Sequence, residues 1–278
     1  MRSDPALSLK NLTVCYGGGC EACRGEMAKG MKKNRCPVCG SIWALREVSL
    51  SLFSGEILGV VGESGSGKSS LLKCLYFDEI PLGGQLTLPD IAENAFSLSR
   101  QAQRRIRNAH MGMVHQNPML GLRMDYSAAA NIAENLIAAN CRNVRLLQDR
   151  IDELLDIVEM SSYRRRETPR HFSGGMQQRV QIAKAIANRP DILLLDEVTT
   201  GLDLSVQAKI LDVLKKIIRD FNISAVLVSH DLAVIRMLAH RTVVMLDGKI
   251  IEQGLTDQVL EDPQHFYTQQ LVHSLLCI

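Results

Sequence analysis

The stretch GESGSGKSS, Gly62 to Ser70, constrains the fold of this chain more than any other part of the sequence. Its first eight residues fit the pattern G-x-x-x-x-G-K-S without a mismatch. An apolar run, ILGVV, precedes it, and a helical pattern opens on KSSLL. Glycines let such a loop curl until several backbone N–H groups point at one anion, and the helix N-terminus adds partial positive charge. We therefore expect a phosphate-binding loop, rather than a glycine-rich turn without a ligand.

The residues of this loop have different expected roles. Lys68 is expected to reach the β- and γ-phosphates of a nucleotide, and Ser69 to ligate Mg²⁺. The residues of the loop expected to contact the nucleotide are Gly62, Ser64, Gly65, Gly67, Lys68, Ser69 and Ser70.

A second motif, ILLLDE, ends in the carboxylates Asp196 and Glu197. An apolar strand that ends in two acids places them at the carboxyl edge of a parallel sheet, where phosphate loops also lie. Asp196 is expected to hold Mg²⁺ through water, and Glu197 to polarise the attacking water as general base. An isolated acidic pair would suit a solvated strand end equally well, but the phosphate loop favours the catalytic interpretation.

Strand and helix patterns alternate along the chain, which predicts an α/β fold with a mainly parallel core sheet. With the phosphate loop, this pattern predicts the core of a P-loop nucleoside triphosphatase, and we expect an antiparallel β-subdomain near the N-terminus. Residues 127–165 are expected to be helical throughout, inside a helical subdomain of about residues 117–175. The segment RTVVMLDGKIIEQG predicts two strands joined by a turn at Asp247–Gly248.

Bulk composition narrows the class of protein. A length of 278 residues suits one large domain, here residues 1–278, and 46% hydrophobic residues suffice for a sizeable core. The net charge of +2 gives no electrostatic case for nucleic-acid binding. The N-terminus lacks the build of a signal peptide, and no apolar run reaches the roughly 18 residues of a membrane span. We therefore expect a cytoplasmic protein.

Residues 20–40 hold two Cys-x-x-Cys pairs, Cys20/Cys23 and Cys36/Cys39. In a reducing compartment paired cysteines favour metal over disulfides, and four thiolates suit tetrahedral Zn²⁺. A redox-active iron site and four free thiols remain alternatives. Because a closed Cys₄ site has no open position for catalysis, we predict a small, structural, zinc-ribbon-like insertion. Cys15 is a fifth thiol nearby, and its place in a strand predicts a packing role.

The stretch FSGGMQQR, Phe172 to Arg179, decides the family. It resembles the signature of the ATP-binding-cassette ATPases, and further family motifs follow in the family's order. These are Tyr16, Gln116 in VHQNP, the GLD stretch at 201–203, and His230 in VSHD. Two positions depart from the family's pattern: Val198 stands where proline is usual, and Met176 where many members have glutamine.

The resemblance implies a role for each matching residue. Tyr16 stacks on adenine, Gln116 senses Mg²⁺ and couples to partners, and His230 contacts the γ-phosphate. Asp203 belongs to the loop that communicates across the dimer. The signature residues are Ser173, Gly174 and Gly175 in this sequence, and they bind the γ-phosphate held by the other subunit. ATP, which is bound together with Mg²⁺, would thereby join two copies of the chain in a head-to-tail homodimer.

The segment around and after Gln116, HQNPMLGLRMDYSAAANIAENL, indicates which partner protein the chain binds. It resembles the ATP-binding subunit of the bacterial carbon–phosphorus lyase machinery, matching Gly121–Arg123, Ser127 and Asn131–Ile132. Ala129 and Ala130 replace two usual glycines. A homodimer docked on the lyase core is therefore the expected assembly, and some such subunits also carry the cysteine segment.

The C-terminal DPQHFYTQQL instead resembles peptide and nickel importers, which would require separate membrane permeases as partners. A nucleic-acid-directed ATPase has little support from the charge.

Overall fold

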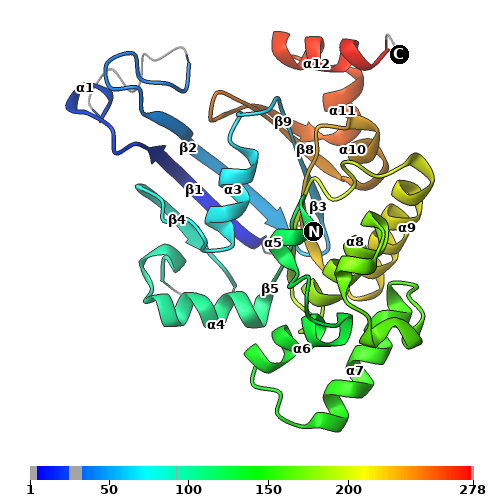
Figure 1. The fold of residues 1–278 in the computed structure, drawn as a ribbon. Helices are drawn as coiled ribbons and strands as arrows, with labels where there is room; N and C mark the ends of the chain where they lie inside the picture. The colour runs from blue at the N-terminus through cyan, green and yellow to red at the C-terminus, as the bar shows by residue number, and fades with distance from the viewer. Residues whose placement is uncertain (1–4, 25–32, 90, 92, 277–278) are drawn as a thin grey trace. The chain divides into compact units, whose positions relative to one another are not determined.

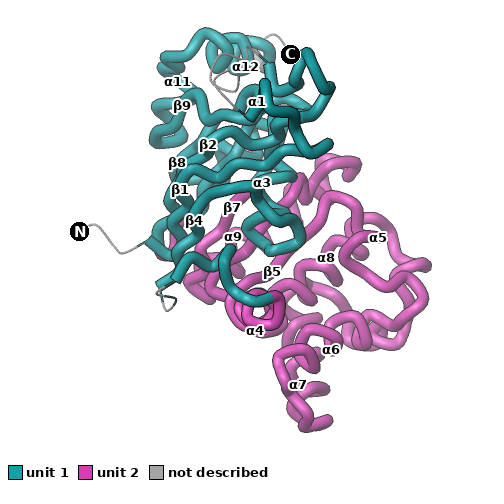
Figure 2. Tube along the Cα trace, turned by 90° about the vertical axis from the view of Figure 1, so that its left-hand side faces the viewer, with its two compact units in different colours: residues 1–53, 57–99, 228–278 teal, residues 54–56, 100–227 magenta. Residues whose placement is uncertain are grey.

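The computed structural model describes residues 5–24, 33–89, 91 and 93–276, with residues 1–4, 25–32, 90, 92 and 277–278 outside the description. Part of the segment between the two cysteine pairs thus lies outside the described residues. The chain divides into two compact units, coloured separately in Figure 2. Unit 1 comprises residues 1–53, 57–99 and 228–278, and unit 2 comprises residues 54–56 and 100–227.

Unit 1 holds the N-terminal strands, the phosphate loop and the C-terminal helices. Its helices and strands carry the labels of Figure 1. Its elements are β1 (Pro5–Tyr16), α1 (Glu21–Arg24), β2 (Ile42–Phe53), β3 (Ile57–Val61), α3 (Lys68–Leu75), β4 (Gly83–Thr87), the 3₁₀ turn η1 (Ala95–Ser97), α10 (Leu232–Leu238), β8 (Arg241–Leu246), β9 (Lys249–Leu255), α11 (Thr256–Glu261) and α12 (Phe266–Leu276).

The N-terminal sheet of unit 1 is antiparallel, in the order β2-β1-β4, which confirms the predicted antiparallel subdomain. Along β1 the buried residues alternate as Leu7 and Leu9, and then as Leu12 and Val14. The three-residue step between Leu9 and Leu12 coincides with a register shift at Asn11, whose φ is +52°. Such an irregularity bends the strand and returns the later side chains to the buried face.

Strand β3 carries the phosphate loop at its carboxyl end and consists of five buried residues. It pairs in parallel with β8, and β8 pairs antiparallel with β9. The turn between β8 and β9 lies at Asp247 and Gly248, as predicted, with φ of +47° and +78°. Positive φ at both central residues gives the right twist for a tight hairpin.

Unit 2 contains a three-strand segment in the order β5-β6-β7, together with several helices. Its elements are α4 (Arg100–His110), β5 (Met111–Val114), α5 (Pro118–Gly121), α6 (Ala128–Ala138), α7 (Val144–Ile157), η2 (Ser162–Arg166), η3 (Pro169–His171), α8 (Gly174–Ala185), β6 (Ile192–Asp196), α9 (Leu204–Asp220) and β7 (Ser224–Val228), the last residue of which is assigned to unit 1. Strands β5 and β6 run parallel, as predicted.

The prediction that residues 127–165 are helical throughout is wrong in detail. Helix α6 ends at Ala138 and α7 begins at Val144, where the side chain of Asn143 accepts hydrogen bonds from the N–H groups of Arg145 and Leu146. Asn140, in the left-handed region with φ +68°, closes α6. The local helix cap thus outweighs the periodic pattern. A new helix start leaves N–H groups without helical partners, and the side chain of Asn143 accepts hydrogen bonds from two of them. The limits of the helical subdomain, about 117–175, stay a prediction.

No helix among the described residues combines the length and the apolar character needed to cross a membrane.

Candidate nucleotide site and cysteine cluster

The phosphate loop depends on glycines at two points of close backbone approach. A Cβ on Gly62 would lie 2.2 Å from the carbonyl oxygen of Met245, and one on Gly67 would lie 2.2 Å from that of Ala44. Both glycines also have positive φ, +149° and +107°. Side chains at these positions would therefore push the loop away from the neighbouring strands, which explains the pattern in steric terms.

Lys68 begins helix α3 and is buried, with 5% of its surface exposed. Its Nζ donates to the carbonyl oxygens of Gly62 at 2.6 Å and of Glu63 at 2.8 Å. The ammonium group is thus held inside the curl of the loop, beside the start of a helix. A positive charge in this setting is suited to binding a phosphate oxyanion.

Tyr16, at the end of β1, contacts the same helix. Its hydroxyl group lies 3.1 Å from Oγ of Ser70, in the first turn of α3. Ser64, Gly65 and Ser69 are exposed. The structure therefore gathers Tyr16 and the loop within unit 1, and the stacking role of Tyr16 stays a prediction.

In unit 2 the structure joins the acidic motif to the coupling glutamine. Gln116 Nε2 donates to Oε2 of Glu197 at 2.8 Å, although 81 positions separate them in sequence. Thr200 Oγ1 also donates to Oε2 of Glu197, at 3.3 Å. Glu197 follows β6 with φ of +45°, while Asp196 ends the strand and is half-buried. The carboxylate is thereby oriented by two donors, as a general base that must hold one water in place would be.

The signature begins helix α8, with Ser173 as its N-cap. Ser173 Oγ accepts from the N–H of Met176 at 3.4 Å, and Ser173 and Gly174 are exposed. Gly175 has an additional structural role, because a Cβ there would lie 2.4 Å from Cγ1 of Val206 in α9. The start of a helix carries partial positive charge, which suits the binding of an anion at this exposed position.

The remaining predicted residues occupy helix starts and loops. Asp203 caps α9, accepting hydrogen bonds from Ser205 Oγ at 2.7 Å and from the N–H of Val206 at 3.0 Å. The hydrogen bond from Ser205 is the main cause that lowers the pKa of the Asp203 carboxyl. His230 is exposed in unit 1, which rules out a core histidine. Val198, at the usual proline position, is buried in unit 2.

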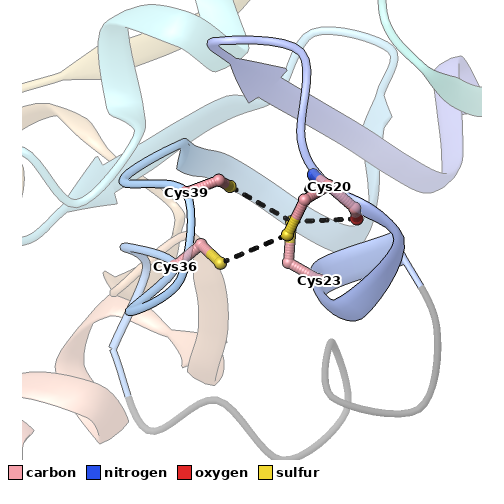
Figure 3. Close-up of side chains that lie close together, drawn as sticks. All are labelled: Cys20, Cys23, Cys36 and Cys39. Carbon is pink, nitrogen blue, oxygen red and sulfur yellow. Dashed lines mark hydrogen bonds between the residues drawn. The ribbon is translucent and has the colours of Figure 1, made fainter.

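The four paired cysteines form one cluster, as Figure 3 shows. Their sulfur atoms all lie within 4.8 Å of one another, and three of the Sγ–Sγ distances are 3.7, 3.9 and 3.8 Å. A tetrahedral site with Zn–S bonds of about 2.3 Å has sulfur–sulfur edges of about 3.8 Å. The donor set and its spacing therefore fit a tetrahedral metal ion, and the cluster can hold one.

The cluster rests on a small apolar base. Cys23, Cys36 and Trp43 are buried together, and Cys15 packs against them. Cys15 does not belong to the group of converging thiols, which confirms its predicted packing role. Hydrogen bonds with Ser41 lower the pKa of the Cys39 thiol to about 6, which favours the thiolate that metals bind.

Two residues outside any recognisable motif also contact the cysteine cluster or the phosphate loop. Ser41 Oγ donates to the carbonyl oxygen of Gly17 and lies 3.2 Å from Cys39 Sγ, and Asn34 Nδ2 donates to the carbonyl oxygen of Gly65 in the phosphate loop. No pattern in the sequence indicates either residue, because each contact joins segments that are distant in the sequence.

The order of these motifs on an α/β fold defines an ATP-binding-cassette ATPase. The ABC transporter family model matches residues 45–200, and the chain belongs to this family and is an ATPase.

Two curated relatives and two solved structures place the chain more closely. It is 40% identical, over 99% of both chains, to the "putative phosphonates utilization ATP-binding protein PhnK" of Escherichia coli K12. It is 37% identical to the dipeptide transport ATP-binding protein DppD of Haemophilus influenzae, over 84% of this chain and 72% of that protein. The ATP-binding cassette MJ0796, a dimer in a post-hydrolysis state bound to ADP and Pi, matches with a TM-score of 0.75 and 29% identity over 90% of this chain and 98% of that one. At 21% identity, cbiO1 of Clostridium perfringens has the same fold, with a TM-score of 0.77 over 99% of this chain and 100% of that one.

Proposed function

We propose that the chain binds MgATP through the residues described above. Lys68 binds the β- and γ-phosphates, Ser69, Gln116 and Asp196 hold Mg²⁺, and Glu197 polarises the attacking water. The buried ammonium of Lys68 inside the loop is the observation that carries this proposal. Tyr16 stacks on adenine and His230 contacts the γ-phosphate.

We propose further that two copies of the chain form a head-to-tail dimer bridged by ATP. The exposed start of α8 at Ser173 and Gly174 supplies the second anion site, and Asp203 lies in the loop that follows the acidic motif. The dimeric state of the related cassette MJ0796 supports this arrangement. Hydrolysis removes the charge that bridges the two copies, so the dimer opens after each turnover.

The biological role that we propose is in phosphonate breakdown, with the homodimer docked on the carbon–phosphorus lyase core. The match to the phosphonates utilization protein extends over both whole chains and supports this role. In this role ATP cycling drives conformational change in the core, and this chain does not itself cleave the carbon–phosphorus bond.

The segment after Gln116 supplies a candidate docking surface. Met119 and Leu120 in α5 are 65% and 74% exposed, and Tyr126 is also exposed. Fully buried Asn131 fixes this segment, because its Oδ1 accepts from the N–H of Arg123 at 2.8 Å and its Nδ2 donates to the carbonyl oxygen of Arg123 at 3.0 Å. Exposed apolar side chains on a rigid support are typical of a protein interface.

The test of this role is binding of the purified protein to purified lyase core in the presence of ATP. Leu120→Asp is expected to weaken binding at least roughly tenfold, because it places a charge in a desolvated contact. Ile80→Asp, at another exposed apolar position, is the control and should bind normally. Both variants should unfold thermally close to the native protein. Native protein that binds permease-containing vesicles but not the core would contradict the lyase role.

The second candidate role is the energy subunit of a peptide importer. The similarity to the dipeptide transport protein, at 37% identity, favours it. The same experiment separates the two roles, because an importer subunit would bind permeases through the same segment.

For the cysteine cluster we propose a structural Zn²⁺. The sulfur spacing near 3.8 Å supports zinc. The sequence between the two pairs, RGEMAKGMKKNR, is basic and has few apolar residues, so the bound metal would supply most of the local folding energy.

Replacing Cys36 and Cys39 by serine is expected to remove one Zn²⁺ per chain, because two ligands cannot hold a structural site. Elemental analysis of the purified protein measures this loss. Cys74→Ser, at a buried thiol outside the cluster, is the control and should retain zinc. Native protein without metal would overturn the proposal.

A further inference from the structure

The cysteine segment touches the phosphate loop directly. Asn34 lies two residues before Cys36, and its Nδ2 donates to the carbonyl oxygen of Gly65 at 3.2 Å. The same peptide group is held on its other side, where the N–H of Ser66 donates to the carbonyl oxygen of Glu63 at 3.1 Å. Rotation of this peptide would break both hydrogen bonds, so Asn34 helps to fix which way the N–H groups of the loop point.

Asn34 is itself held by the second cysteine pair and by β2. Its carbonyl oxygen accepts from the N–H of Trp43 at 2.7 Å. Next to it, the N–H of Cys36 donates to the carbonyl oxygen of Ser41 at 2.8 Å, and Cys36 Sγ lies 3.9 Å from Cys20 Sγ. A metal bound by the cluster would therefore tie the segment that carries Asn34 to the segment that follows β1.

A second connection runs from the cluster to Tyr16. Ser41 Oγ lies 3.2 Å from Cys39 Sγ and donates to the carbonyl oxygen of Gly17 at 3.0 Å. Gly17 follows Tyr16, whose hydroxyl lies 3.1 Å from Ser70 Oγ at the start of α3. All these contacts lie within unit 1.

We propose that the cysteine segment is a positioning element for the nucleotide site. Metal held by the four thiols fixes Asn34 against Gly65, and Asn34 thereby raises the affinity of the phosphate loop for ATP. This inference rests on the proposed role of the loop in ATP binding. Asn34 acts on the nucleotide through the loop and does not contact the reacting atoms.

Trp43 offers an independent measure of the state of the cluster. It is the only tryptophan in the sequence, it is 7% exposed, and it packs against Cys23 and Cys36. Its fluorescence therefore reports whether the surroundings of the cluster are intact, whatever the nucleotide site does.

The experiment compares ATP affinity, by calorimetry with Mg²⁺, for zinc-loaded protein and for protein freed of zinc by a chelator that is then removed. Loss of the hydrogen bond to Gly65 is expected to weaken binding roughly threefold to tenfold. Asn34→Ala should show a similar loss and a raised KM with unchanged kcat, while it keeps its zinc and its Trp43 emission. Asn34→Gln, which retains an amide donor, should recover part of the affinity. Val38→Ala, at an exposed position in the second cysteine pair, is the control and should behave as native.

The outcomes separate this inference from the function on which it rests. If Asn34→Ala binds ATP as tightly as native protein, the inference is wrong and the ATP site stands. It is equally wrong if Asn34→Ala lowers kcat at unchanged KM, or if it loses zinc. If zinc-loaded native protein does not bind ATP, the proposed role of the loop fails first. Because Asn34→Ala is expected to keep the metal, it tests the inference even if the metal-free protein unfolds.

Discussion

Glu197→Gln is expected to lower kcat for ATP hydrolysis by about 10²- to 10⁴-fold, the usual contribution of a general base. Glutamine has nearly the same shape but cannot accept a proton from the attacking water. Gln116 and Thr200 donate the hydrogen bonds that orient Glu197, and both can still contact a side-chain oxygen at this position. ATP binding should therefore survive, and because hydrolysis no longer removes the bridging charge, the ATP-bound dimer should accumulate.

Steady-state phosphate release measures the first effect, and size-exclusion chromatography with ATP measures the second. Asp212→Asn, which neutralises an exposed acid on α9, is the matched control and should keep full activity. A Glu197→Gln protein that hydrolyses ATP within tenfold of native would remove Glu197 from the role of base.

Lys68→Ala is expected to weaken ATP binding at least about a hundredfold, which corresponds to the loss of two charge-assisted hydrogen bonds. In the structure the ammonium donates to the carbonyl oxygens of Gly62 and Glu63. Those carbonyls hold the charge at the centre of the loop, where a phosphate would meet it. Alanine removes this charge without altering the glycines that shape the backbone.

Calorimetric titration with MgATP measures the change, and thermal unfolding shows whether the variant is folded. Lys73→Ala removes an exposed ammonium from the same helix and serves as the control. Native-like affinity in Lys68→Ala would mean that phosphate binds elsewhere.

Local patterns predicted the features that depend on neighbouring residues. The buried strand β3, the loop at its end and the tight turn at Asp247–Gly248 all lie where their sequences indicate. Such features follow from backbone sterics and short-range hydrogen bonds, which a few consecutive residues determine. The prediction of one uninterrupted helix over 127–165 was wrong because a local interaction decides the break. The helix cap at Asn143 outweighs the apolar periodicity of the longer segment.

The tertiary structure decided which distant residues meet. The sequence by itself determined the family, the phosphate loop and the paired cysteines, because each is written in a short motif whose chemistry requires those residues. It did not determine that Gln116 bonds Glu197, that Gly175 makes room for Val206, or that Asn34 holds Gly65. These contacts join residues 31 to 81 positions apart. They form only when strands pair and helices pack, so no spacing of residues along the chain predicts them.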